Sequence, residues 1–153
     1  MTGVQTCALP ISRNGELDGV AYHFVSKESF QKMIDENVFL EWADFAGARY
    51  GTPRQPVMDA LHEGKDVLLE IEIEGARQVK AAMPEALMVF LQPPSMAELE
   101  SRITNRGTDT PERISARLAL ARAEMAAAHE FDHVLTNHRV EDVIDSLVSF
   151  AAQ

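Results

Sequence analysis

The residues best suited to chemistry lie in one stretch of forty residues in the first third of the chain. This stretch contains an arginine, two tyrosines, a glutamate and a threonine: Arg13, Tyr22, Glu41, Tyr50 and Thr52. Guanidinium and phenol groups donate hydrogen bonds to a phosphate, and a carboxylate accepts them from the N–H edge of a base. Together these residue types predict a pocket for a purine monophosphate. Taken singly, the two tyrosines could equally be structural residues, because tyrosine is common in strands.

Three arginines in the second half of the chain form another candidate site. Arg102 and Arg106 are four residues apart and would share a helix face, and Arg117 follows beyond a polar loop. Three converging guanidiniums could clamp a phosphoryl group during transfer, because its charge is spread over three oxygens. The alternative is a solvated helix face paired to nearby acids, and the spacing alone favours this alternative. The acids in question are Glu98, Glu100 and Glu112.

Two acids lie toward the carboxyl end of a predicted buried strand, residues 67–73. Glu70 and Glu72 are two residues apart, so on a strand they would share one face. They could orient a metal-bound water or the amino group of a base, or they could simply face solvent. Beside a phosphate site, such a pair also favours magnesium. No histidines have metal-ligand spacing, and the sequence contains neither G-x-S-x-G nor the phosphate-loop motif G-x-x-x-x-G-K-[ST].

Periodicity and turn residues predict the elements that position these side chains. Strands are predicted over residues 22–25, 40–45, 49–52, 67–73, 87–91 and 133–136, with 67–73 the clearest buried strand. Helices are predicted over residues 26–38, 57–62, 75–83, 95–106, 111–129 and 140–151. From residue 67 onward strands and helices alternate, which indicates a parallel α/β sheet with right-handed crossovers. Such sheets bind ligands at the carboxyl ends of their strands, where Gln92 and Asn137 also lie.

Composition narrows the possible partners. A chain of 153 residues can form one domain, and a net charge of -10 disfavours nucleic acid as a ligand. The longest apolar run falls short of the ~20 residues that a membrane helix needs. The single cysteine, Cys7, excludes a disulfide framework and a cysteine zinc site. Residues 1–12 carry no charge and no period, and they resemble the translation of a sequencing-library adapter. We therefore expect this segment to be artefactual or disordered.

Six segments, in order, resemble the guanylate kinase family. They are RNGELDGVAYHFVS, FLEWADFAGARYGTP, DVLLEIEIEGARQV, FLQPPS, NRGTDTPERISARL and FDHVLTN, which lie between Arg13 and Phe150 and so span about nine-tenths of the chain. The resemblance implies an α/β fold with a P-loop-kinase-type parallel sheet and helices on both faces. It also implies a small mixed GMP-binding subdomain at residues 13–65, and a core at residues 66–153 with a helical lid at about 102–117. The N-terminal P-loop strand of that fold would be missing.

The resemblance further implies a function and a set of site residues. The activity would be ATP-dependent phosphorylation of GMP to GDP in the cytoplasm, with Mg²⁺ accompanying ATP and with no nucleic-acid or membrane partner. The GMP phosphate would be bound by Arg13, Tyr22 and Tyr50. The guanine edge would be bound by Glu41, Thr52 and Glu72. The lid arginines, which bind ATP phosphates and the transition state, would be Arg102, Arg106 and Arg117, and Asn137 would approach the adenine.

The sequence departs from the family pattern in several places. The family's phosphate-binding loop and its lysine would lie upstream of Arg13, and a further arginine is expected where Pro10 stands. Glu72 occupies a position that is usually aspartate, and Glu74 one that is often glutamine. We therefore expect an N-terminally truncated, inactive kinase whose unpaired sheet edges favour aggregation. The alternative is a non-catalytic, guanylate-kinase-like protein-binding module, against which the retained Glu41, Tyr50 and lid arginines argue.

Overall fold

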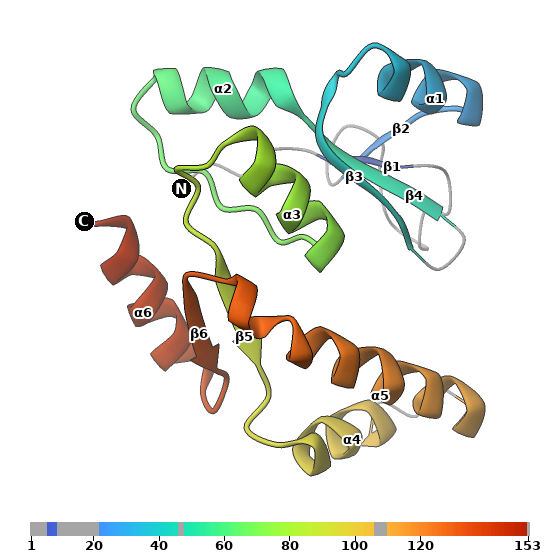
Figure 1. Ribbon diagram of the computed structural model, residues 1–153, viewed down its shortest axis with the longest axis vertical. Coiled ribbons are helices and arrows are strands. Elements are labelled where there is room, and N and C mark those ends of the chain that lie inside the picture. Colours follow the sequence, from blue (N-terminus) through green and yellow to red (C-terminus); the bar gives the residue numbers. More distant parts are fainter. Residues whose placement is uncertain (1–5, 9–21, 46–47, 106–109, 153) are drawn as a thin grey trace. The chain divides into compact units, whose positions relative to one another are not determined.

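The computed structural model describes residues 6–8, 22–45, 48–105 and 110–152. The chain divides into two compact units, Met1–Ala86 and Leu87–Gln153 (Figure 1). Within the described ranges, no helix combines the length and the apolar character needed to cross a membrane.

The first unit is built on a mixed sheet with strand order β2-β1-β4-β3. Strands β3 and β4 form an antiparallel pair, β1 runs antiparallel to β4, and β2 runs parallel to β1 (Figure 1). The unit contains β1 (Thr6–Ala8), β2 (Tyr22–Phe24), α1 (Lys27–Asp35), β3 (Phe39–Phe45), β4 (Ala48–Pro53), α2 (Arg54–His62) and α3 (Ile73–Ala82). The sheet thus places β3 and its neighbour β4 at one edge.

Strand β1 lies in the segment that the sequence analysis set outside the fold. Its Cα partners are residues 22–24 of β2 on one side and residues 50–51 of β4 on the other. Pairing in a sheet uses the backbone N–H and C=O groups, so it does not require the alternating side-chain pattern on which the prediction rested. The structure therefore differs from the expectation at Thr6–Ala8.

Helix α1 covers one face of the β3–β4 pair. Ser26 caps it, because its hydroxyl accepts a hydrogen bond from the Ser29 N–H at 3.1 Å. Phe30 is fully buried, and its ring lies 4.6 Å from the ring of Phe39. Gly51 leaves room for that ring on β4, since a Cβ there would lie 2.8 Å from Phe39 Cδ1. This face of the sheet is therefore a packed core.

Residues 67–72 form an extended segment that leads into α3, and the predicted buried strand at 67–73 is wrong. Of residues 67–72, only Val67 makes a β bridge. Alternate side chains, Val67, Leu69 and Ile71, pack against a hydrophobic cluster formed by Leu40, Val57 and Val79. The intervening side chains face outward, and Leu68 is 53% exposed. A strand needs a hydrogen-bonded neighbour along its length, and an apolar run does not reveal whether one exists.

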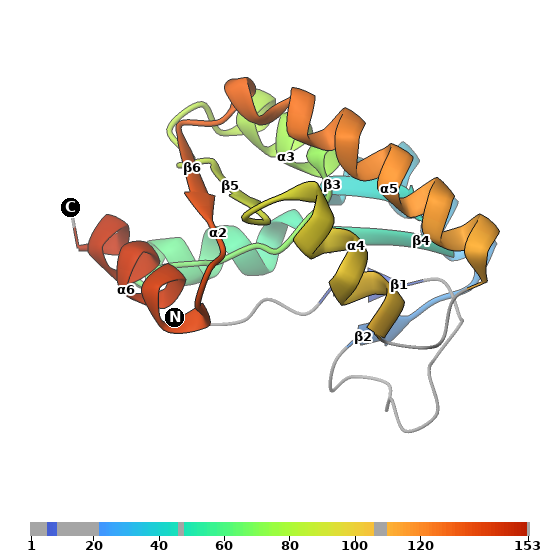
Figure 2. The ribbon, with the colours of Figure 1, turned by 90° about the horizontal axis from the view of Figure 1, so that it is seen from below.

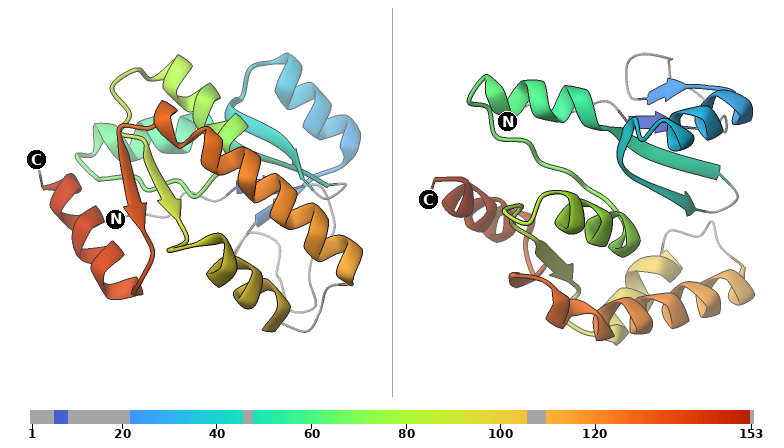
Figure 3. Two further views of the ribbon diagram at one scale, coloured as in Figure 1. Left: turned by 60° about the horizontal axis from the view of Figure 1, so that its bottom comes forward. Right: turned by 45° about the horizontal axis from the view of Figure 1, so that its top comes forward.

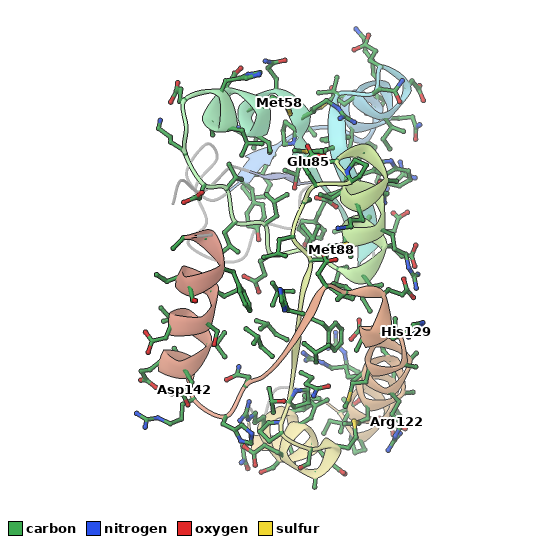
Figure 4. The ribbon with its side chains drawn as sticks, turned by 60° about the vertical axis from the view of Figure 1, so that its left-hand side comes forward. Met58, Glu85, Met88, Arg122, His129 and Asp142 are labelled. Carbon is green, nitrogen blue, oxygen red and sulfur yellow. The ribbon has the colours of Figure 1, made fainter. Side chains whose placement is uncertain are left out.

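The second unit has a parallel two-stranded sheet joined by a helical crossover (Figure 2). It contains β5 (Val89–Gln92), α4 (Met96–Asn105), α5 (Pro111–Ala126), a short 3₁₀ helix (Ala128–Glu130), β6 (His133–Thr136) and α6 (Val140–Ala151). Helices α4 and α5 pack together (Figure 3). The side chains of Arg122 and Asp142 project from α5 and α6, whereas Met88 is buried just before β5 (Figure 4). Parallel strands with helical crossovers agree with the predicted α/β class.

Candidate functional site

A buried acid and a buried hydroxyl form the centre of the candidate site. Glu41 on β3 and Thr52 on β4 are directly paired across the hairpin, and they are 5% and 1% exposed. The Thr52 hydroxyl donates a hydrogen bond of 2.5 Å to Glu41 Oε1. Among the described residues, these are the buried side chains that are charged or polar. Buried carboxylates are costly unless they are paired, so this pair is a candidate for function.

Burial changes the acidity of this carboxyl group. Removal from water raises the pKa of Glu41 above its ordinary value, because burial penalises the charged form. Hydrogen bonds from the side chain and backbone of Thr52 act in the opposite direction and lower the pKa. The net shift is upward. A ligand that donates hydrogen bonds to the carboxylate would restore part of the stabilisation that water provided.

Helix α3 lies close to the Glu41 side chain at Gly75. A Cβ on Gly75 would lie 2.6 Å from Glu41 Oε2, a distance that real Cβ atoms do not show. Glycine therefore permits the close approach of helix and carboxylate. One turn later, the Gln78 side chain accepts a hydrogen bond from the Trp42 N–H at 3.1 Å and donates one to the Trp42 carbonyl at 2.8 Å.

The two tyrosines lie together on the same sheet. The rings of Tyr22 and Tyr50 are 6.0 Å apart and meet edge to face at 61°. Tyr50 is two residues from Thr52 on β4, so both point to the face that carries Glu41. The structure thus brings together four of the residues predicted for the monophosphate pocket. The fifth, Arg13, lies outside the described residues.

Arg49 belongs to the other face of β4. Its Nε lies 3.1 Å from Asp44 Oδ1, its Nη1 donates to Gln31 Oε1 at 2.9 Å, and its guanidinium lies 5.7 Å from the centre of the Trp42 ring. These contacts join β3, β4 and α1. Arg49 therefore has a structural role.

In the second unit, Arg102 joins α4 to the end of β6. Its Nε donates to Glu98 Oε1 at 2.9 Å, and its Nη2 donates to the Asn137 carbonyl at 3.3 Å. The Asn137 N–H in turn donates to the Gln92 carbonyl at 2.8 Å. The Glu98 contact is the pairing that the solvated-face alternative predicts. Arg106 lies outside the described residues, so the convergence of the three arginines stays a prediction.

Arg117, the third member of the predicted arginine clamp, lies on α5. Arg117 is exposed there, and α5 packs against α4. Glu112 lies in the first turn of the same helix. The pKa of its carboxyl is lowered by its own backbone N–H and by the Thr110 hydroxyl. This acid is therefore engaged with the start of α5.

The acids predicted for a metal or a base are exposed. Glu72 is the N-cap residue of α3, and Glu70 precedes it on the outward face of the extended segment. The prediction that both share one face agrees with this arrangement. In the part of the chain that the structure describes, no group of three or more potential ligands could hold a metal ion. The described side chains therefore do not form a metal cage of their own.

Two residues of this site were not assigned to it from the sequence. Gly75 was interpreted only as the start of a helix, although a glycine inside a helical pattern often marks a close approach. Gln78 carried no signal at all, because its amide bonds a backbone 36 residues away. Both were missed because their partners are distant in sequence.

Comparison with known proteins decides the family. The family model for guanylate kinase matches residues 6–153. This chain belongs to the guanylate kinase family. It is 54% identical over 140 residues to a guanylate kinase of Thermobifida fusca, covering 92% of this chain and 71% of that protein. It is 55% identical to a guanylate kinase of Streptomyces coelicolor, with coverage of 90% and 70%.

The fold agrees with the guanylate kinase assignment. A crystal structure of guanylate kinase from Anaplasma phagocytophilum matches with a TM-score of 0.83 and 28% identity, covering 99% of this chain and 74% of that one. The resemblance stated from six sequence segments is therefore confirmed, and so is the α/β kinase fold. The roles of individual residues toward guanylate kinase substrates stay predictions.

Proposed function

We propose that the residues of this site serve the guanylate kinase reaction, in which ATP phosphorylates GMP to give GDP. The observation that carries the proposal is the buried Glu41–Thr52 pair in a chain of this family. A carboxylate has about four acceptor sites, so the bond from Thr52 leaves capacity for a ligand. Guanine presents two adjacent N–H donors, whereas adenine presents an acceptor at the corresponding ring position. Glu41 would therefore select guanine.

The phosphate of GMP would lie toward the tyrosine pair. Tyr22 on β2 and Tyr50 on β4 present phenol groups from the two strands that flank β1, and Arg13 would add a cation. Glu72, the N-cap residue of α3, would also contact the guanine edge. This arrangement would orient GMP with its base at Glu41 and its phosphate at the tyrosines.

The donor nucleotide would be bound by residues of the second unit. Arg102, Arg106 and Arg117 would stabilise charge on the transferring phosphoryl group, and Asn137 would contact the adenine. Mg²⁺ is commonly held by one or two carboxylates together with substrate phosphates, so it would enter with ATP and not require a protein cage. Both nucleotides are cytoplasmic metabolites, and we expect the reaction there.

Titration calorimetry with GMP, IMP and AMP tests base selection directly. IMP lacks the exocyclic amino group of guanine but keeps the ring N–H. We expect affinity to fall from GMP to IMP to AMP, by roughly tenfold for each donor that Glu41 loses. Equal affinities for GMP and AMP would contradict the proposal. A protein-binding module would show no preference among the three nucleotides.

A further inference from the structure

Strand β3 lies at the edge of the described sheet. At Trp42, the backbone N–H and carbonyl form hydrogen bonds with a side chain of α3. Trp42 has its N–H bonded to Gln78 Oε1 at 3.1 Å and its carbonyl bonded to Gln78 Nε2 at 2.8 Å. The same Nε2 also donates to the Glu74 carbonyl of α3 at 3.2 Å. The Gln78 amide thus makes the two backbone hydrogen bonds that a neighbouring strand would otherwise make with Trp42, and it links α3 to β3.

The residue that Gln78 holds is the immediate neighbour of Glu41. Gln78 and Gly75 are three residues apart, so they share one face of α3. At Gly75 the helix approaches the Glu41 carboxylate, and at Gln78 it is bonded to the next backbone unit of the same strand. Thr52 fixes Oε1 from the opposite side, across the hairpin. Thr52 therefore bonds the carboxylate itself from β4, whereas the Gln78 bonds hold the adjacent backbone of β3 to α3.

We infer that Gln78 is a positioning residue for base recognition, which holds β3 at the distance from α3 where Glu41 can accept both guanine donors. The inference rests on the proposed function, because it assigns the aim of Glu41 toward GMP. Gln78 lies beside β3 on the side away from β4, and acts only through the backbone of Trp42. Loss of its amide would leave two backbone groups without their partner and would free β3 to shift.

The test compares Gln78→Ala with Gln55→Ala in the 153-residue chain. Gln55 is an exposed glutamine of α2 whose amide bonds Asp59 within the same helix, so it controls for loss of a glutamine side chain. Calorimetry with GMP and IMP measures the preference that depends on the exocyclic amino group. We expect Gln78→Ala to reduce this preference roughly tenfold, while IMP affinity changes little. We expect Gln55→Ala to keep the parent preference.

A second variant guards against a folding defect. Gln78→Glu keeps an acceptor for the Trp42 N–H but loses the donor to the Trp42 carbonyl, so we expect an intermediate loss of preference. A purely structural role would weaken GMP and IMP binding equally, and that result would overturn the inference. An unchanged preference in a folded Gln78 variant would also overturn it. If the parent chain itself shows no preference for GMP over IMP, the proposed function fails, and the inference falls with it.

Discussion

At the scale of single residues, the proposed role of Glu41 requires its carboxylate to accept hydrogen bonds both from Thr52 and from a base. Replacing it by glutamine keeps its size but puts a donor where guanine also donates. We expect Glu41→Gln to weaken GMP binding by roughly 10- to 100-fold, or about 1–3 kcal/mol, with little effect on AMP. Titration calorimetry measures both affinities. Glu85→Gln, at an exposed glutamate of the same unit, is the control and should bind GMP like the parent.

The same substitution should have the opposite effect on stability. Since burial raises the pKa of folded Glu41 above its ordinary value of 4.5, the protonated form favours folding. This contribution is fully present below pH 4.5 and is lost as the pH rises through the folded-state pKa. Glutamine is neutral at every pH and does not carry this penalty.

We therefore expect the melting temperature of Glu41→Gln, relative to the parent, to increase as the pH rises above the ordinary carboxyl pKa of 4.5 and through the raised pKa of folded Glu41. Thermal denaturation at several pH values without nucleotide checks this result. A difference that stays constant with pH would show that Glu41 keeps its ordinary acidity. A difference that grows with pH would mean that the carboxylate proposed to bind GMP lowers stability, an opposition that is common at functional sites.

At the scale of elements, helix α3 can lie close to Glu41 because residue 75 is a glycine and has no Cβ. In most helices Gly→Ala stabilises by roughly 1 kcal/mol. At Gly75 the added Cβ would lie 2.6 Å from Glu41 Oε2, so we expect Gly75→Ala to destabilise by about 1–3 kcal/mol and to weaken GMP binding. Thermal denaturation and calorimetry give the two values.

Gly64→Ala is the matched control for this prediction. Gly64 has φ of 71°, where alanine is strained, but a Cβ there would meet nothing within 4 Å. It should lower stability and leave GMP affinity unchanged. Similar GMP affinity in both alanine variants would show that α3 does not need to approach Glu41 so closely.

The elements that were predicted well are those specified by neighbouring residues. The structure has the starts of α1 and α5 where they were expected, because Ser26 and Pro111 are local signals. The extended segment 67–72 was misassigned because a strand depends on a partner elsewhere in the chain. Glu41 and Thr52 were each predicted as site residues from their residue types. Their direct pairing across the hairpin, and the approach of α3 to Glu41, could be seen only in the structure.

At the scale of the whole molecule, the sequence of 153 residues contains no G-x-x-x-x-G-K-[ST] motif. The backbone N–H groups and lysine of such a loop normally hold the β- and γ-phosphates of ATP. We expect a polypeptide of these residues to bind GMP, to bind ATP weakly, and to show no GMP-dependent release of ADP. A coupled assay measures ADP release. Clear GMP-dependent turnover would mean that other residues supply the phosphate site.

Exposed apolar side chains on α6 should govern association of the chain. Val140, Ile144 and Val148 recur every four residues and are each more than half exposed, with Ile144 at 52%. Such a stripe favours self-association, although the net charge of -10 opposes it. We expect Ile144→Glu to reduce concentration-dependent light scattering without changing GMP affinity. Equal scattering by parent and variant would show that this stripe does not mediate association.

Trp42 is the single tryptophan of the chain, and its place in the fold makes it an intrinsic optical probe. It adjoins Glu41 on β3, its backbone is bonded by Gln78, and the Arg49 guanidinium lies over its ring. Indole emission depends on local polarity and on nearby cations. Its fluorescence should therefore respond to a nucleotide base arriving beside β3, and to unfolding of the first unit, without any attached dye. The protein thus carries its own spectroscopic probe of the strand that holds Glu41.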